Sequence, residues 1–137
     1  MWYSYFYISI RARIMSLHID HILTTDLREA YSYLIDMGEL EQWFEVSEKG
    51  PSPKRSVNFK YAGKRTTPFA FIVNSGERKD YHLFYLRLPR MGNKQRAEDM
   101  FGQEIVNENP KGEITIQIRN LSDAEKVWRL VDEVRLK

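Results

Sequence analysis

Two histidines and an acidic residue stand close together near the start of the chain and could bind a metal ion. His18 and His21 are three residues apart with Asp20 between them, and on one face of a helix this spacing would bring both imidazoles to one cation. The surrounding residues indicate a strand end and a loop, and the sequence shows no third ligand. We therefore expect no metal site here.

A second group with possible chemistry is Glu77-Arg78-Lys79, which has the Glu-x-Lys spacing of a metal-dependent nuclease half-site. In such a site a carboxylate holds magnesium while the lysine supports the attacking water, and the motif lies on a strand beside another acidic ligand. Here it falls in a predicted hairpin turn. His82 alternates with Phe84 and Leu86 on an inward face, so we expect a hydrogen-bonded core histidine. We expect no catalytic residues and no cofactor, although an enzyme stays open as an alternative.

The composition narrows the classes of protein further. The chain has 137 residues, of which 42% are hydrophobic and 29% charged, and this suits a single domain over residues 1–137. The absence of cysteine excludes disulfide scaffolds, cysteine-ligated zinc and thiol catalysis. No apolar run approaches the roughly 20 residues of a membrane span, and the first apolar run lacks the charge order of a secretory signal. We expect a cytoplasmic protein with no membrane partner.

The formal net charge of +2 hides a separation of charge along the chain. Residues 49–97 hold twelve bases and two acids, whereas residues 16–48 hold one base and eight acids. A basic segment interleaved with tyrosines is typical of a surface that contacts phosphates and unpaired bases. The residues that we expect to contact nucleic acid are Lys54, Arg55, Lys60, Lys64, Arg65, Arg78, Lys79, Tyr85, Arg87 and Arg90. The alternatives are a solvated sheet surface and a basic surface that meets an acidic one, within one chain or across a dimer.

Apolar residues at helical spacing predict three helices. The first has its cap at Thr25 or Asp26 and ends near Gly38, and a further helical turn follows through Phe44. The other two cover residues 93–101 and 122–134, the last beginning with a capping box of Ser122 and Glu125. Because each helix has one apolar stripe, we expect all three to cover one face of a sheet.

Residues that alternate with a period of two predict five strands. They cover residues 2–14, 57–62, 68–74, 81–88 and 114–118. Hairpin-length connections separate the middle three, which therefore form a meander. The predicted fold class is α+β, with a mainly antiparallel sheet made of an N-terminal strand, a three-stranded meander and a late strand, and about three helices packed on one face.

The predicted N-terminal strand is rich in aromatic residues, namely Trp2, Tyr3, Tyr5, Phe6 and Tyr7. An edge strand with these rings is costly to expose, and pairing it with a second copy would bury both the edge and the rings. Met15 begins a second plausible start, so residues 1–14 are either an extra segment or a dimer-forming one. The alternative function is thus a homodimeric or protein-interaction module with an acidic or self partner and no nucleic acid.

Three segments have a familiar pattern, namely residues 81–90 (YHLFYLRLPR), 112–118 (GEITIQI) and 121–125 (LSDAE). Together they resemble a small domain of unknown function that is often appended to predicted restriction-type nucleases, and the resemblance covers residues 57–134. The His-Trp-Gly-type segment of that domain is replaced by Asn-Glu-Asn-Pro at residues 107–110. The resemblance implies an accessory role near nucleic acid and names no site. Separately, we expect a setting in defence or mobile-element biology, with an environmental mobile gene cassette as one origin. Our first hypothesis is therefore a non-enzymatic binding domain whose basic meander contacts nucleic acid.

Overall fold

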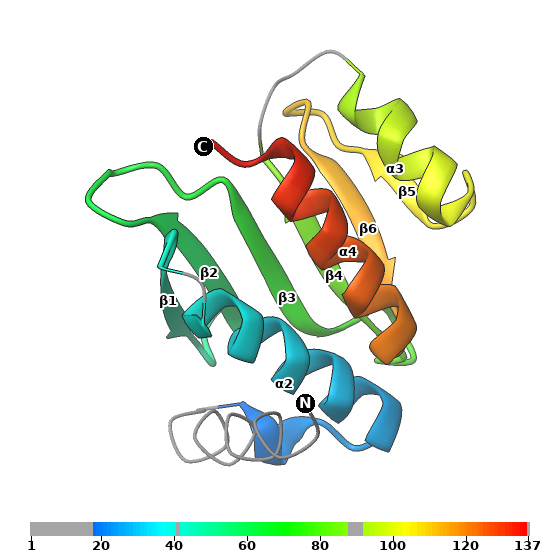
Figure 1. The fold of residues 1–137 in the computed structure, drawn as a ribbon. Helices are drawn as coiled ribbons and strands as arrows, with labels where there is room; N and C mark the ends of the chain where they lie inside the picture. The colour runs from blue at the N-terminus through cyan, green and yellow to red at the C-terminus, as the bar shows by residue number, and fades with distance from the viewer. Residues whose placement is uncertain (1–17, 41, 88–91, 137) are drawn as a thin grey trace.

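A six-stranded antiparallel sheet is the frame of the protein (Figure 1). The computed structural model describes residues 18–40, 42–87 and 92–136. The sheet has the order β1-β2-β3-β4-β6-β5, and every neighbouring pair is antiparallel. The strands are β1 (Phe44–Lys49), β2 (Ser56–Tyr61), β3 (Phe69–Ser75), β4 (Tyr81–Leu86), β5 (Val106–Glu108) and β6 (Ile114–Ile118).

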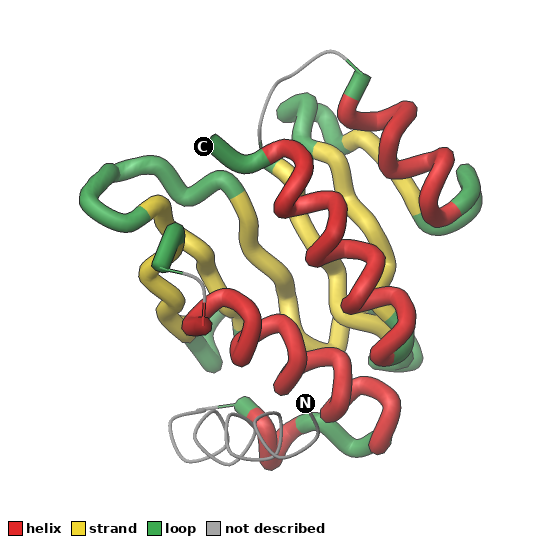
Figure 2. Tube along the Cα trace, viewed as in Figure 1, coloured by secondary structure: helices red, strands yellow, loops and turns green. Residues whose placement is uncertain are grey.

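The helices pack on one side of this sheet. They are α2 (Thr25–Leu40), α3 (Asn93–Phe101) and α4 (Leu121–Val134), with a short 3₁₀ helix η1 (Ile19–His21) before α2. Figure 2 shows α2 and α4 crossing the same face, with α3 beside β5 at the edge. The α+β class with an antiparallel sheet is confirmed. Among the residues described, no helix is long and apolar enough to cross a membrane.

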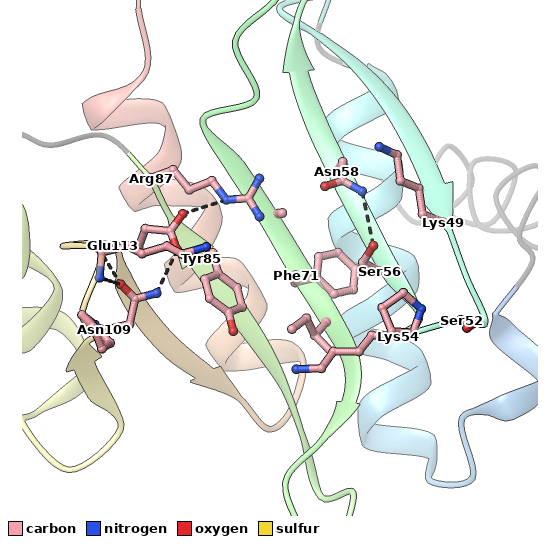
Figure 3. Close-up of a pocket in the computed structure, with 15 residues that line it drawn as sticks. Lys49, Ser52, Lys54, Ser56, Asn58, Phe71, Tyr85, Arg87, Asn109 and Glu113 are labelled. Atoms are coloured by element: carbon pink, nitrogen blue, oxygen red, sulfur yellow. Dashed lines mark hydrogen bonds and ion pairs between the residues drawn. The ribbon is translucent and has the colours of Figure 1, made fainter.

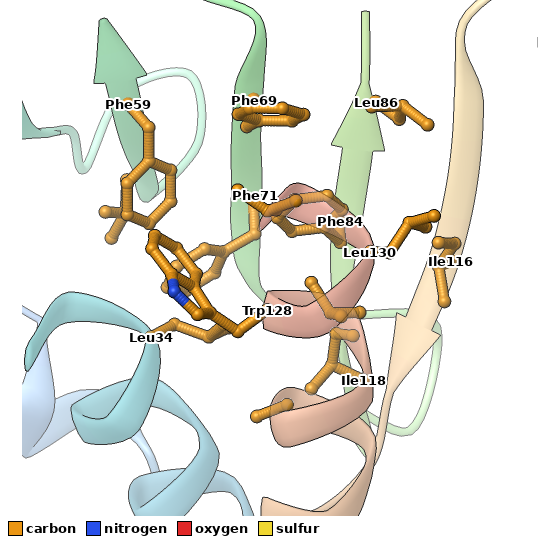
Figure 4. Packing of buried hydrophobic residues seen from close by; sticks show 14 of the residues in the cluster. Leu34, Phe59, Phe69, Phe71, Phe84, Leu86, Ile116, Ile118, Trp128 and Leu130 are labelled. Atoms are coloured by element: carbon orange, nitrogen blue, oxygen red, sulfur yellow. The ribbon is translucent and has the colours of Figure 1, made fainter. Parts of the chain in front are cut away.

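Alternation along the strands explains why one face is covered. On β2, Val57 and Phe59 are fully buried while Asn58 between them is only partly buried, and β4 alternates in the same way. The inward rings Phe59, Phe69, Phe71 and Phe84 meet Leu34 of α2 and Trp128 and Leu130 of α4 (Figure 4). The Trp128 ring lies 5.9 Å from the rings of both Phe44 and Phe59.

The predicted helical turn through Phe44 is wrong, because Phe44 begins β1. It pairs with Tyr61 of β2, and the two rings stack with centroids 5.6 Å apart. These non-local contacts outweigh the helical spacing of the local apolar residues. The meander and the late strand are confirmed to within one or two residues over the described part of the chain. The three-residue strand β5 was not expected, and the predicted strand over residues 2–14 lies outside the described residues.

Both predicted helix caps shift toward the N-terminus. The Thr24 hydroxyl accepts a hydrogen bond from the Leu27 amide at 3.3 Å, so α2 is capped one residue before Thr25. The capping box at Ser122 is wrong: the Asn120 side chain accepts from the Asp123 amide at 2.9 Å. The Asp123 carboxylate in turn accepts from the Arg119 amide at 2.9 Å. The cap therefore stands two residues earlier than predicted. It differs from a capping box, because the Asp123 carboxylate accepts from the amide of Arg119, one residue before the cap, and not from that of Asn120.

Gly38 is not the end of α2, which continues to Leu40. A Cβ at this position would lie 2.5 Å from Cε1 of Phe59, closer than real contacts allow. The glycine is therefore required by the close approach of the helix to β2. Its signal in the sequence indicated a helix end, whereas its role is packing.

His82 is fully buried between the sheet and the start of α2. Its Nδ1 accepts a hydrogen bond from the Asn74 amide at 3.1 Å, and its Nε2 lies 2.9 Å from the Leu27 carbonyl oxygen. The neutral ring with its proton on Nε2 satisfies both contacts, whereas a second proton on Nδ1 would face the Asn74 N–H. Burial lowers the pKa of His82 from 6.5 to about 4, against the opposing effect of the Leu27 carbonyl. The expected core histidine is confirmed.

We expect the free energy of unfolding to fall as the pH is lowered from 6.5 to about 4. In this window the unfolded chain protonates His82 and the folded protein does not, so acid favours the unfolded state by up to about 3 kcal/mol. Urea unfolding between pH 7 and pH 4 measures the effect. His82→Gln cannot titrate and should flatten the profile, whereas His21→Gln, at an exposed position, should not. Identical profiles for His82→Gln and the unmodified protein would contradict this prediction.

Candidate functional site

A groove of about 530 Å³ crosses the face of the sheet that points away from α2 and α4 (Figure 3). Its floor is made by side chains of β2, β3 and β4. One wall is the loop over residues 50–55 between β1 and β2, and the other is the turn over residues 109–113 between β5 and β6. The volume falls within the range of small-molecule sites, about 300–1,000 Å³. We call this feature the open-face groove.

Tyr85 of β4 lies in the middle of the open-face groove. The antiparallel register places Ala70 of β3 opposite it on one side and Thr115 of β6 on the other. Both neighbours have short side chains, so neither can cover the tyrosine ring. The ring is partly buried on the groove floor and accessible from above.

The surroundings of Tyr85 keep its hydroxyl protonated. Burial is the largest cause that raises the pKa of Tyr85 above 10.0, and the negative charge of Glu113 raises it further. The Arg87 guanidinium acts in the opposite direction and lies 5.9 Å from the ring centre. At neutral pH the side chain is therefore a phenol, which can donate a hydrogen bond as well as stack.

The turn over residues 109–113 is held by a chain of polar contacts. Arg87 Nε lies 3.1 Å from a Glu113 carboxylate oxygen, and the Asn109 amide group donates to the other oxygen at 2.8 Å. The Asn109 side-chain oxygen also accepts from the backbone amides of Lys111 and Glu113, both at 3.0 Å. Figure 3 shows Arg87, Glu113 and Asn109 joined in this way. The turn thus presents Lys111 from an anchored backbone.

The opposite wall is equally tied to the sheet. The Val73 amide of β3 donates to the Arg55 carbonyl at 2.9 Å, and the His18 ring contacts the Lys49 carbonyl at 3.0 Å. Gly50 has φ +127°, and a Cβ there would lie 2.6 Å from the Lys54 carbonyl oxygen. Only glycine permits the loop to fold back so closely, and this fold-back carries Lys54 over the groove.

Three lysines on the groove lining make no ion pair within the described residues, namely Lys49, Lys54 and Lys111. All three are exposed. By contrast, Arg87 is paired with Glu113, and Lys60 with Glu45. The lining therefore has a net positive charge and cations available to an anionic ligand.

The acidic segment of the chain lies mainly in the other layer. Exposed Asp26 and Glu29 belong to α2, on the covered face of the sheet. Glu45 is an exception, because it alternates onto the open face and pairs with Lys60 across the β1–β2 register. The two charged segments of the sequence thus lie largely on opposite sides of the sheet. This arrangement limits repulsion of an anion bound at the open face.

A second groove, also of about 530 Å³, lies beyond the loop over residues 50–55. Arg55, Lys79 and His21 line it, and Lys54 lines both grooves. Asn74 stands at a register shift of β3 with φ +53°, and its side-chain amide donates to the His21 carbonyl at 2.6 Å. The cationic side chains of the two grooves therefore form a continuous series around the loop over residues 50–55.

The structure separates the basic residues that the sequence grouped together. Lys54, Tyr85 and Arg87 line the open-face groove, and Arg55 and Lys79 line the second groove, with Arg78 in the adjacent hairpin tip. Lys64 and Arg65 are in the β2–β3 tip at the other end of β3, whose length is about 20 Å. Lys60 is next to that end and contacts the Lys64 carbonyl at 2.6 Å. Successive turns of a meander must fall at opposite sheet ends.

Several of the expected residues lie outside the described part of the chain. They are Arg90 and the aromatic residues Trp2, Tyr3, Tyr5, Phe6 and Tyr7. Among the described residues, no three histidine or acidic side chains lie together as metal ligands would. His18 is buried and His21 is exposed.

Four members of the site are not predicted from the sequence, namely Lys49, Lys111, Asn109 and Glu113. The Asn-Pro-Lys-Gly pattern at residues 109–112 indicates a turn, so the local shape was readable. The position of this turn beside Arg87 could not be predicted from the sequence. Glu113 reaches Arg87 only because β4 pairs with β6, which aligns Leu86 with Ile114.

We expect Glu113→Gln to lower the pKa of Tyr85 while leaving it above 10.0. The substitution removes one of the charges that raise this pKa, and burial, the larger cause, stays. NMR titration of protein carrying ¹³C-labelled tyrosine follows the ring directly. Glu108→Gln, an equal change of charge at an exposed position of β5, is the matched control and should have less effect. An unchanged Tyr85 pKa in Glu113→Gln would contradict the assigned interaction.

No protein-family model, curated protein or solved structure matches this chain. The resemblance to the domain appended to nucleases therefore stays a prediction.

Proposed function

We propose that this protein is a non-enzymatic domain that binds nucleic acid through the open face of its sheet. The observation that carries the proposal is the convergence of Lys49, Lys54 and Lys111 on one groove that contains an accessible tyrosine. These lysines come from the end of β1, the following loop and the β5–β6 turn. Lysines that surround a concave surface attract anions, and an aromatic ring on its floor suits a ligand with planar groups.

A ligand with repeated charges fits better than a single small anion. The open-face groove continues past Lys54 into the second groove, where Arg55 and Lys79 stand. Within the described residues, none of these cations is ion-paired. A nucleic acid backbone presents one phosphate after another, and each neutralised phosphate releases bound counterions. The planar bases also distinguish a nucleic acid from an acidic peptide, which has no base to stack on Tyr85.

The proposal moves the expected contacts from the hairpin tips to the grooves. It retains Lys54, Arg55, Lys79, Tyr85 and Arg87 from the set expected on the sequence, and it adds Lys49 and Lys111. Lys64 and Arg65 lie outside both grooves. Substitutions in the grooves and substitutions at the β2–β3 hairpin tip should therefore give different results in the same binding experiment.

We expect the affinity for a fluorescently labelled oligonucleotide to fall with salt, with a slope of log K against log salt of about −3 to −5. Fluorescence anisotropy at several salt concentrations measures it. The double variant Lys54→Ala/Lys111→Ala should weaken binding and reduce the slope by roughly 1.4 to 1.8, since each lost phosphate contact removes about 0.7 to 0.9.

The matched control is Lys64→Ala/Arg65→Ala, which removes the same charge from the β2–β3 hairpin tip, outside both grooves, and should leave the slope nearly unchanged. Equal effects of the two double variants would show that general charge, and not the groove, governs binding. Failure to bind any nucleic acid would refute the proposal. So would equal affinity for polyglutamate of similar length, which would favour an acidic protein partner.

A further inference from the structure

We propose that the open-face groove holds one unpaired nucleotide, with its base stacked on Tyr85, so that the protein selects single strands over duplexes. This inference rests on the proposed function and specifies the class of nucleic acid. It commits to a ligand that combines a free base with a flanking phosphate on each side. Duplex nucleic acid and free nucleotides are outcomes of the test.

The floor of the groove provides a platform for one planar group. Tyr85 lies between Ala70 and Thr115 across the strands, and both are too short to fill the space above the ring. Ile72 of β3 adds an apolar side chain to the same floor. Every base has a planar face that can stack on an aromatic ring, so stacking on Tyr85 requires no particular base.

The polar residues of the floor lie to one side of this platform. Asn58 and Ser56 of β2 line the groove, with the Asn58 amide 3.3 Å from the Ser56 hydroxyl (Figure 3). An amide and a hydroxyl can each exchange hydrogen bonds with the edge of a base. In the antiparallel register Asn58 faces Ala70, which places it two strands from Tyr85 in the same cross-strand row.

The lysines stand where the two flanking phosphates of a stacked nucleotide would emerge. Lys54 belongs to the loop over residues 50–55 and Lys111 to the turn over residues 109–113, which are the two walls, and Tyr85 lies on the floor between these walls. Arg87 is held by Glu113 on the Lys111 side, so this wall carries a cation of defined position as well as an exposed one. A single nucleic acid strand that crosses the groove from wall to wall therefore meets positive charge, then the Tyr85 ring, and then positive charge again.

A duplex does not offer the same fit. Its bases are stacked on one another and paired, so their faces are not available to a protein ring, and its grooves are read by elements that protrude. Here the sheet surface is recessed between the loop over residues 50–55 and the turn over residues 109–113. A duplex could contact the lysines on the rim without reaching Tyr85.

The test compares an eight-nucleotide single strand, as DNA and as RNA, with a duplex of the same sequence by fluorescence anisotropy. We expect both single strands to bind more tightly than the duplex. Tyr85→Leu should weaken single-strand binding about 5- to 150-fold, the range for loss of one stacked base. Tyr85→Phe should keep most of the affinity, and duplex binding should change little in either variant.

Tyr81→Leu is the matched control, because Tyr81 lies on the same strand and the same face but outside the groove. It should leave single-strand affinity unchanged, and thermal unfolding of all variants confirms that they are folded. If Tyr85→Leu unfolds, blocking the groove with Asn58→Trp, at a partly buried position that lines it, tests the same contact and should lower single-strand affinity without affecting the duplex.

Two results would overturn the inference while leaving the proposed function intact. One is equal affinity for the duplex and the single strands. The other is full single-strand affinity in folded Tyr85→Leu when Lys54→Ala/Lys111→Ala still weakens binding. Adenosine monophosphate should compete only at much higher concentration than the oligonucleotide. Competition at equal concentration would indicate that the ligand is a free nucleotide and not a strand. Absence of binding to every nucleic acid would instead refute the proposed function.

Discussion

Packing of Trp128 against Phe44 and Phe59 joins the helical layer to the sheet, and the rest of the molecule depends on this one-sided contact. Aromatic side chains contribute large buried areas, and truncating one in a core typically costs about 3–5 kcal/mol. Because side chains alternate along a strand, burying Phe59 and Phe84 under the helices turns Asn58 and Tyr85 to the other face. The open face is therefore a consequence of the core and not a separate feature.

The same constraint organises the charges. Exposed acids of α2 lie on the helical layer, whereas the unpaired lysines of the groove lie around the open face, within the part of the chain that the structure describes. A net charge of +2 thus conceals a basic segment and an acidic segment that lie largely on opposite sides of the sheet. The acidic residues that do reach the open face form ion pairs with neighbouring cations. Glu45 pairs with Lys60, and Glu113 anchors Arg87 beside the groove.

Rigid walls are the second property that the site needs, and each is built differently. The turn over residues 109–113 is fixed by the side chain of Asn109, which accepts two backbone amides and contacts Glu113. The loop over residues 50–55 is fixed by the close fold-back at Gly50 and by the bond from Val73 to Arg55. Lysines on anchored backbones lose less freedom on binding a ligand than lysines on mobile tips, which favours the grooves over the hairpins.

The sequence by itself determined the fold class, most of the meander, the late strand and the inward position of His82, because the period of two in residues 57–61 and 81–86 is a local property. It also revealed the basic segment that supplies Lys54, Tyr85 and Arg87. Only the tertiary structure decided that Phe44 starts a strand and that Lys111 and Lys54 line one groove. It also decided that Lys64 lies far from Lys79. These arrangements follow from the order of strands in the sheet and from contacts distant in sequence, and no local pattern of residues encodes them.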